Sequence, residues 1–578
     1  MRKENQGQEV ILYGWVNRQR DMGNLIFIDL RDRAGVVQAV VDSETPDLLE
    51  KTKRIRMEYV LGIKGLVRER AADLRNPQMD TGEIEVALTS LEILNPSKVP
   101  PFLVSETDQA SDELRFKYRY LDLRRPAMQH NFKLRHEVSL AVRNFLSGLG
   151  FYEIETPFLT RSTPEGARDY LVPSRIYKSR FFALPQSPQI FKQILMIAGY
   201  DRYFQIVRCF RDEDLRADRQ PEFTQIDMEM SFVEKEEIFS VVERMMAAIF
   251  KIIGVDITLP FPRMTYEESM ERYGTDKPDL RFGMEILDFS ALACRLSSDI
   301  ISRVCEGGGV LRGLLIPDKG ALSRSQLDKL NMKARQLGGK GLIWIKRQDG
   351  AFKSSLKIED AAFGLIWEKA GAGQEDLLLL IAGGKETARQ VLGELRLDLR
   401  PPQTKDGGPY RLAWISEFPL FEWSAEENRP VSMHHPFTSP FEEDMDYLES
   451  NPLKVRAKAY DLVLNGIEIG GGSIRIHRAD VQKRIFRALG LKEEEFQEKF
   501  GFFLEALGYG APPHGGIAMG FDRIVMLLAG QDSIREVIPF PKTTSSLCLM
   551  TKAPAKVSAR QLGDLGLALI KPGDDPDF

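Results

Sequence analysis

The sequence has few of the residues that cross-link a chain or anchor it in a membrane. It contains four cysteines, Cys209, Cys294, Cys305 and Cys548, and no pair has the spacing of a metal site or a redox motif. We therefore expect neither a disulfide scaffold nor a zinc site. The best candidate for a membrane span, LLLLIA at 377–382, is far shorter than the ~18–20 residues required. The N-terminal MRKENQGQEV has no apolar signal segment, which predicts a cytoplasmic protein.

An excess of positive charge is also missing. The chain has 79 Lys and Arg against 84 Asp and Glu, which gives a net charge of −5. This balance excludes a uniformly basic nucleic-acid coat, but it permits local patches that bind nucleic acid. Hydrophobic residues make up 43% of the 578 positions, which is typical of a soluble globular protein. The length predicts about three or four domains.

The first 95 residues show the pattern of a small β-domain. Alternating apolar residues and turn residues predict five strands and one short helix within 44–56. This combination favours a Greek-key barrel of the OB type. The predicted strands are 10–16, 25–30, 35–41, 59–67 and 84–88. The Pro-rich stretch that follows predicts a linker or hinge over 96–125.

The rest of the chain divides into a strand-rich region and a glycine-punctuated insertion. Apolar positions at helical spacing predict a helix from His130 to Leu149, which Gly150 ends. An extended segment over 151–157 follows it. We expect the strand-rich region to occupy 126–265 and 396–550, with an inserted domain over 266–395 and a C-terminal extension over 551–578.

Two predicted strands within 203–232 place unusual side chains on one sheet face. By period-two alternation, Arg211 and Glu213 share a face of the first strand, and Phe223 and Asp227 share a face of the second. A face that mixes charges with an aromatic ring is too polar for a core. It is either a solvated sheet face or, as we favour, the floor of a polar pocket.

A second pair of segments adds acids, glycines and a cation. Asn465-Gly466 predicts a two-residue hairpin turn, which brings Asp461 onto the same face as Glu468, one diagonal step away. Two converging carboxylates suit Mg²⁺ together with phosphate oxygens, although an exposed acidic pair is the alternative. The glycine-rich run 510–520 leads into a helix that starts near Arg523, and such a start can seat a nucleotide.

Together these segments resemble the three signature motifs of the class II aminoacyl-tRNA synthetases. The closer resemblance is to the bacterial aspartyl-tRNA synthetases, and it covers essentially the whole chain. It implies an α+β multidomain fold with an OB-type anticodon barrel, an antiparallel-sheet catalytic domain and an inserted GAD-like α+β domain. The segments that carry the three motifs are 130–157, 210–227 and 520–523. Those that carry the closer likeness are 162–169, 186–192, 434–438 and 461–477.

The resemblance implies a two-step reaction. Aspartate would attack the α-phosphate of ATP to give aspartyl-adenylate, and tRNA-Asp would then take the aspartyl group. Whether tRNA-Asn is charged as well stays open. Such chemistry depends on positioning and charge stabilisation, with Mg²⁺ accompanying ATP. In the family motif 1 forms a homodimer interface; helix packing within one chain is the alternative.

The resemblance also assigns roles to individual residues. The catalytic group would be Arg211, Glu213 and Arg523, and the metal ligands would be Asp461 and Glu468. The ATP site would comprise Arg211, Asp212, Glu213, Gln220, Phe223, Glu468, Gly520, Phe521, Asp522 and Arg523, with Phe223 and Arg523 on either side of the adenine ring. The aspartate site would comprise Glu165, Ser187, Gln189, Lys192, Arg211, Asp227, His434 and Arg475.

Selectivity for aspartate has a physical rationale in this assignment. An asparagine substrate would leave Arg475 and Lys192 facing a neutral amide, and a buried charge without its partner costs roughly 3–5 kcal/mol. Without the resemblance, Lys192 is as readily interpreted as a surface lysine, and His434 as a loop residue with no role.

The barrel is expected to bind the tRNA anticodon. OB folds bind single-stranded bases with aromatic rings and local cations, and this binding weakens as salt rises. Phe27 is the candidate for stacking, and Arg20, Arg31 and Gln38 are candidates for base or phosphate contacts. The alternative is that Phe27 fills the barrel core.

Three other functions compete with this interpretation. An asparaginyl- or lysyl-tRNA synthetase shares the barrel and the motifs, but the insertion and the Arg475/Lys192 pair argue against it. An RNA-binding protein with an inactive synthetase-like domain predicts missing motif residues, yet Arg211 and Arg523 are present. An ATP-dependent amide-forming ligase has no need of an anticodon barrel.

Overall fold

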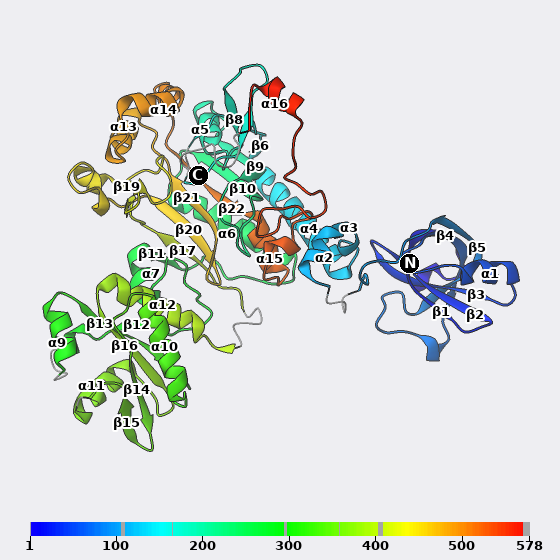
Figure 1. Ribbon diagram of the computed structural model, residues 1–578, viewed down its shortest axis with the longest axis horizontal. Helices are drawn as coiled ribbons and strands as arrows, with labels where there is room; N and C mark the ends of the chain where they lie inside the picture. Colours follow the sequence, from blue (N-terminus) through cyan, green and yellow to red (C-terminus); the bar gives the residue numbers. More distant parts are fainter. Residues whose placement is uncertain are drawn as a thin grey trace. The chain divides into compact units, whose positions relative to one another are not determined.

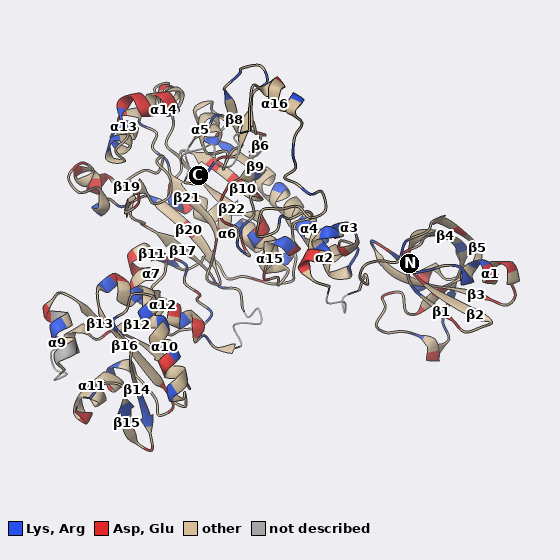
Figure 2. Cartoon of the chain, viewed as in Figure 1, with Lys and Arg blue, Asp and Glu red and all other residues tan. Residues whose placement is uncertain are grey.

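The computed structural model describes residues 2–105, 110–163, 166–293, 298–357, 359–402 and 409–569. The chain forms two compact units, one of Met1–His136 with Arg535–Lys556 and the other of Glu137–Ile534 with Val557–Phe578 (Figure 1). Acidic and basic residues are interspersed along both units, as the near-balanced composition predicts (Figure 2). Among the residues described, no helix has the length and apolar character needed to cross a bilayer.

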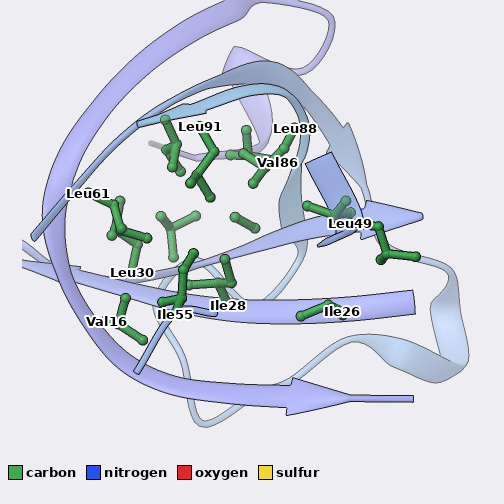
Figure 3. Close-up of a cluster of buried hydrophobic side chains, with 14 of the residues drawn as sticks. Val16, Ile26, Ile28, Leu30, Leu49, Ile55, Leu61, Val86, Leu88 and Leu91 are labelled. Atoms are coloured by element: carbon green, nitrogen blue, oxygen red, sulfur yellow. The ribbon is translucent and has the colours of Figure 1, made fainter. Parts of the chain in front are cut away.

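The N-terminal strands close into the predicted barrel, in the order β1-β2-β3-β5-β4. Alternate residues point inward, so that Ile26, Ile28 and Leu30 of β2 are buried in the barrel core (Figure 3). The first and last strands are longer than the sequence predicts. The elements are β1 (Glu9–Asp21), β2 (Leu25–Asp32), β3 (Gly35–Asp42), α1 (Pro46–Lys53), β4 (Val60–Glu69) and β5 (Ile84–Asn95), with 3-10 turns η1 (Lys3–Asn5) and η2 (Ala72–Leu74).

The segment predicted as a linker contains two short helices, α2 (Asp112–Lys117) and α3 (Arg119–Asp122). Leu121 packs on Phe102 and Val104, and the buried Arg119 donates hydrogen bonds to the backbone carbonyls of residues 535, 538 and 539. These contacts explain why residues near the end of the sequence belong to the first unit. These contacts could not be predicted from the proline-rich composition alone.

The helix predicted over 130–149 is α4 (Pro126–Gly148), which begins one turn earlier. Proline suits the first turn of a helix because its missing N–H has no partner there. The positive φ of Gly150, 80°, explains the stop. The extended segment after it is shorter than predicted, with a strand only at β6 (Tyr152–Glu153).

The second unit is built on an eight-stranded sheet in the order β11-β17-β20-β21-β22-β10-β9-β6. The inner pairs are antiparallel, as predicted, and only the two edge pairs β11–β17 and β6–β9 are parallel. The strands not yet given are β9 (Arg202–Phe210), β10 (Glu222–Ser231), β11 (Arg263–Thr265), β17 (Leu412–Ser416), β20 (Ala459–Leu464), β21 (Ile467–Ile474) and β22 (His514–Gly520).

One face of this sheet is sealed by α6 (Lys235–Lys251). Phe239 stacks on Trp414 with ring centroids 3.9 Å apart, and Tyr460 meets Phe239 edge-on at 5.1 Å. Because side chains alternate along β20, the neighbour of Tyr460, Asp461, points to the opposite face. That opposite face carries the cavity described below.

Shorter elements surround the sheet. A phenylalanine cluster that includes the stacked pair Phe486 and Phe500 joins α13 to α14. The helices are α5 (Gln189–Ile197), α7 (Tyr266–Tyr273), α13 (Ala479–Ala488), α14 (Glu493–Leu507), α15 (Phe521–Leu528) and α16 (Ala559–Leu565). The hairpins are β7 (Leu171–Pro173) with β8 (Phe181–Ala183) and β18 (Phe421–Ser424) with β19 (Arg429–Ser432); the 3-10 turns are η4 (Glu442–Tyr447), η5 (Pro452–Lys454) and η6 (Ile534–Glu536).

Within the predicted insertion lies a separate antiparallel sheet, in the order β12-β13-β16-β14-β15. The apolar run 377–382 is its central strand, whose alternate residues are buried in two hydrophobic clusters on opposite faces. The strands are β12 (Ile286–Asp288), β13 (Val310–Ile316), β14 (Ile343–Gln348), β15 (Ala351–Ser354) and β16 (Leu377–Gly383). The helices are α8 (Ser290–Ala293), α9 (Asp299–Glu306), α10 (Arg324–Gln336), α11 (Asp360–Ala370) and α12 (Lys385–Asp398).

Candidate active site

One cavity of about 450 Å³ lies on the sheet face opposite α6 and gathers most of the residues predicted from the motifs. Asp227 and Phe521, the first residue of α15, are buried and do not line the cavity. Glu165 falls outside the described residues. The predicted residues that line the cavity are Ser187, Gln189, Lys192, Arg211, Glu213, Gln220, Phe223, His434, Asp461, Glu468, Arg475, Gly520, Asp522 and Arg523.

Two cations and two carboxylates form a buried network at one end of this cavity. Lys192 Nζ lies 2.6 Å from Asp227 Oδ1 and 3.3 Å from Glu229 Oε2. Arg475 Nε lies 2.8 Å from Glu229 Oε1. All four side chains are at most 2% exposed, so their charges balance inside the protein. Burial raises the pKa of Asp227, whereas Glu229, although equally buried, has its pKa lowered by Arg475 and Lys192.

Two buried polar atoms in and beside the network lack hydrogen-bond partners. Asp227 Oδ2 and Gln189 Nε2 are buried and have no hydrogen-bond partner among the described residues. A buried acceptor without a donor is costly, which indicates that a ligand supplies the missing donor. Beneath the network, a Cβ on Gly516 would lie 2.1 Å from Glu229 Oε2, so only glycine fits there.

The β20–β21 hairpin brings the two predicted metal ligands together. Val463 pairs with Glu468, as the Asn465-Gly466 turn predicts, and both turn residues have positive φ. A bulge between Leu462 and Val463 shifts the register beyond the turn, so that Asp461 pairs with Gly471 instead of lying on a simple diagonal. A Cβ at Gly471 would lie 2.7 Å from Asp461 Oδ1 and 3.8 Å from Glu468 Oε1. Both carboxylates therefore flank one small space.

These two carboxylates have different electrostatic surroundings. Burial and the nearby Glu468 raise the pKa of Asp461. Burial would also raise the pKa of Glu468, but the nearby Lys277 has the larger effect and the pKa is lowered. Lys277 Nζ lies 3.0 Å from Glu468 Oε2. His434 Nε2 lies 3.4 Å from Asp461 Oδ1, and this carboxylate outweighs the effect of burial and raises the histidine pKa.

At the other end of the cavity, motifs 2 and 3 meet. The Arg211 guanidinium lies 5.2 Å from the centre of the Phe223 ring, although β9 ends at Phe210 and Arg211 is thus beyond the strand on which it was predicted. Arg523, predicted to face Phe223 across adenine, donates to the Glu468 carbonyl at 2.9 Å and pairs with Asp218 at 3.0 Å. Glu213 pairs with Arg219 at 3.0 Å.

Two of the predicted ATP residues have structural contacts. Asp522 accepts a hydrogen bond from the backbone N–H of Thr224 at 2.7 Å, which ties α15 to β10. Asp212 forms a backbone bridge with Arg168 and does not line the cavity.

Comparisons with known proteins agree with this geometry. The model of the family "tRNA synthetases class II (D, K and N)" matches residues 111–544, and that of the OB-fold nucleic acid binding domain matches residues 10–94. An aspartate–tRNA(Asp/Asn) ligase of Moorella thermoacetica is 54% identical over 570 residues, which cover 97% of this chain and 94% of the relative. That of Thermodesulfovibrio yellowstonii is 52% identical over 584 residues, with 98% of each covered.

The chain belongs to the aspartate–tRNA ligases, a family of class II aminoacyl-tRNA synthetases. The resemblance to this family inferred from the motifs is confirmed, as are the OB-type barrel and the class II catalytic domain. Among solved structures, asparaginyl-tRNA synthetase from Pyrococcus horikoshii complexed with asparaginyl-adenylate aligns with a TM-score of 0.59 at 19% identity, over 94% of this chain and 97% of that one. At that identity the likeness shows the fold alone.

The sequence patterns gave no role to several residues at this site. Period-two alternation places Glu229 on the same strand face as Asp227, but its part in the buried network was not predicted. Asp276 and Lys277 line the cavity, although the predicted boundary at 266 assigned them to the insertion. Asp218 and Arg219 of the motif 2 loop also line it.

In the barrel, the structure separates the four predicted anticodon residues into two groups. Phe27 lies on the outer face and is only partly buried, so the alternative that it fills the core is wrong. Arg20 lies 5.4 Å from the Phe27 ring centre and donates to Gln38 Oε1 at 2.7 Å. Arg31 is only 6% exposed and donates to both carboxylate oxygens of Glu58 at 2.8 Å. This ion pair orients the Arg31 guanidinium, and its contact with a base or phosphate stays a prediction.

Proposed function

We propose that the protein attaches L-aspartate to tRNA-Asp through an aspartyl-adenylate intermediate, with ATP as the second substrate, and that it also charges tRNA-Asn. The single observation that carries this proposal is the buried network of Lys192, Asp227, Glu229 and Arg475. The name of the Moorella thermoacetica relative, aspartate–tRNA(Asp/Asn) ligase, supports both tRNA substrates.

The network suits an amino acid with a second carboxylate. Lys192 and Arg475 are held by Asp227 and Glu229, so an incoming carboxylate can share cations that are already oriented. The partnerless Asp227 Oδ2 and Gln189 Nε2 suit the α-ammonium and an oxygen of the substrate. Glu165, Ser187 and His434 complete the proposed aspartate site. A neutral side-chain amide would lose the charge-assisted hydrogen bonds to both cations.

The opposite end of the cavity suits ATP. We propose that Arg211 stabilises the charge on the α-phosphate during adenylate formation, because it is the cation nearest the aromatic platform Phe223. Gln220, Glu213, Gly520 and Arg523 line the same space. Asp522 lines this space and ties α15 to β10, and Asp212 and Phe521 are proposed to support it without lining it.

The donor set around Asp461 and Glu468 fits Mg²⁺. Asp461 Oδ1 is approached by His434 Nε2 at 3.4 Å, and the glycine at 471 leaves room beside it. Among the residues described, no three His, Cys, Asp or Glu side chains converge into an all-protein metal site. Mg²⁺ is commonly held by one or two carboxylates with phosphate oxygens completing its shell. When bound, it would neutralise phosphate charge.

The barrel is proposed to bind the anticodon through Phe27, Arg20 and Gln38. The exposed outer face of β2 offers the ring for base stacking, and the Arg20 guanidinium beside it offers a cation. Gln38 is oriented by Arg20 and by Glu85, to which its Nε2 donates at 2.8 Å.

We also propose a cytoplasmic homodimer. Large apolar side chains are exposed on α4, β6 and the β7–β8 hairpin, among them Leu140 at 49%, Tyr152 at 63% and Tyr177 at 63%. Exposed apolar groups of this kind favour a protein interface. Leu140→Glu should yield a monomer by light scattering, whereas Leu365→Glu on α11, with a side chain 43% exposed, should not.

ATP–pyrophosphate exchange tests the function directly. Exchange should depend on aspartate and not on asparagine or lysine, and transcripts of tRNA-Asp and tRNA-Asn should both accept aspartate. Arg211→Ala should abolish exchange while the melting temperature stays close to that of the wild type. Exchange with asparagine or lysine alone, or near-normal exchange by Arg211→Ala, would overturn the assignment.

A further inference from the structure

Lys277 is a cation in the cavity to which no role has been given. It lies on the loop between α7 and β12, where the chain passes from the eight-stranded sheet toward the inserted one. Its Nζ lies 3.0 Å from Glu468 Oε2, and both residues line the cavity. Lys277 therefore lies next to a proposed metal ligand but is not itself a metal ligand.

The loop is fixed at its first end. Gly274 has a φ of 69°, and a Cβ there would lie 2.2 Å from the backbone oxygen of Arg389 in α12. Ser269 Oγ donates to the Thr275 carbonyl at 2.7 Å, and Thr275 Oγ1 accepts from the Lys277 N–H at 3.2 Å. The backbone of Lys277 is thus held in place, and its side chain reaches Glu468 from this fixed point.

The loop is fixed at its other end as well. Arg396 of α12 donates to the carbonyls of Asp279, Phe282 and Met284. The hairpin turn that carries Glu468 packs on the same loop, since a Cβ on Gly466 would lie 3.2 Å from Asp279 Cβ. Lys277 and Glu468 are therefore presented to each other by two anchored segments, and their contact is not an accident of one mobile side chain.

Charge balance suggests what Lys277 does when the site fills. A divalent cation held by Asp461 and Glu468 would compensate the negative charge that Lys277 now pairs with, and it would repel the ammonium. The incoming source of negative charge in this cavity is the triphosphate. We propose that Lys277 pairs with Glu468 in the nucleotide-free enzyme and contacts the β- or γ-phosphate once magnesium and ATP are bound, an inference that rests on the proposed function.

Binding measurements on the full-length protein test this exchange of partners. Lys277→Met keeps the length of the side chain and removes the charge. It should weaken binding of ATP and of pyrophosphate, each with Mg²⁺, by about tenfold or more, because a charge-assisted phosphate contact is lost. It should leave binding of a non-hydrolysable aspartyl-adenylate analogue unchanged, because that ligand has no β- or γ-phosphate. Isothermal titration calorimetry gives all three constants.

Metal binding without nucleotide supplies an independent readout. Loss of Lys277 removes the cation that competes for Glu468, so Lys277→Met should bind Mn²⁺ more tightly than the wild type in an electron paramagnetic resonance titration. Lys333→Met is a matched control, since Lys333 pairs with Asp398 on the surface of the insertion at 2.5 Å. It should change neither Mn²⁺ nor ATP binding.

Three results would overturn the inference: unchanged ATP and pyrophosphate affinity, an equal loss for the adenylate analogue, or unchanged Mn²⁺ affinity. Failure of the proposed function looks different. It would appear in the wild type, as absence of binding to the aspartyl-adenylate analogue. If the wild type nevertheless binds ATP, the comparison between wild type and Lys277→Met still decides the role of Lys277.

Discussion

Arg475 and Glu229 form a two-point ion pair in the interior of the catalytic unit, with Nε 2.8 Å from Oε1 and Nη2 3.1 Å from Oε2. Lys192 approaches the same carboxylate at 3.3 Å. The two cations proposed to select aspartate are thus already paired before the substrate arrives. Such pairing keeps them oriented, and it makes selectivity a property of the whole network.

Replacing Arg475 should separate aspartate binding from ATP binding. In Arg475→Leu the KM for aspartate in pyrophosphate exchange should rise far more than the KM for ATP, because Phe223 and Arg211 are untouched. Glu229 would remain buried without its main partner, which costs roughly 3–5 kcal/mol of stability. The double variant Arg475→Leu/Glu229→Leu should regain stability but not aspartate affinity. Equal changes in both KM values would remove Arg475 from the selectivity role.

Gly516 tests how closely the network is packed. A methyl group at this position would lie 2.1 Å from Glu229 Oε2 and equally close to the Met228 carbonyl. Gly516→Ala should therefore lower stability by about 1–3 kcal/mol and raise the aspartate KM. Gly364→Ala on α11, where nothing lies within 4 Å, is the control and should be neutral or slightly stabilising in thermal melts. A Gly516→Ala enzyme with normal aspartate KM would contradict tight packing.

Features with a short-range cause could be predicted from the sequence. The Asn465-Gly466 turn sets the pairing of Val463 with Glu468. Alternation along β2 sends Ile26 and Ile28 inward and leaves Phe27 outside. In each case local backbone geometry fixes which side chains share a face of the sheet. The order of residues within one strand or turn is therefore sufficient to predict the arrangement.

Features that depend on residues far apart in the sequence could not be predicted from it. Arg119 is buried because carbonyls of residues 535, 538 and 539, more than four hundred positions away, accept its hydrogen bonds. The bulge beside Leu462 and the ion pair of Arg31 with Glu58 depend on partners that no local pattern specifies. The predicted boundary at 266 places Lys277 in the insertion. A change in composition along the chain does not show that the loop between α7 and β12 passes beside the cavity.

Phe27 should matter to tRNA and not to adenylate formation. Phe27→Ala removes a ring on the outer barrel face, and a lost stacking contact with one base costs ~1–3 kcal/mol, or about 5–150-fold in tRNA KM. Pyrophosphate exchange measured without tRNA should keep its rate. Tyr13→Ala is the matched control for a general loss of barrel stability. It removes a different aromatic ring, on β1, whose side chain is 63% exposed. A tRNA KM raised equally by both substitutions would point to damage and not to stacking.

His514 should make the protein less stable in acid. Burial lowers its pKa, and Arg475 and His477 add to this effect against the opposing carboxylate of Glu229. Above pH ~6.5 the folded and unfolded states both hold a neutral imidazole. As the pH falls below that value, the unfolded state takes up a proton that the folded state resists, so stability is lost at up to about 1.4 kcal/mol per pH unit.

His514→Gln isolates this contribution. The variant should melt below the wild type at pH 7.5, because Gln cannot reproduce the contact of Nδ1 with the Pro512 carbonyl at 2.8 Å together with the ring packing. Between pH 6.5 and 5.5, however, its apparent Tm should fall less steeply. The upward pKa shift of His434 acts in both proteins and cancels in the difference. His130→Gln, at an exposed position, is the control. If the Tm of the wild type and of His514→Gln fell in parallel over this pH range, the folded state would not lower the pKa of His514, and the prediction would be wrong.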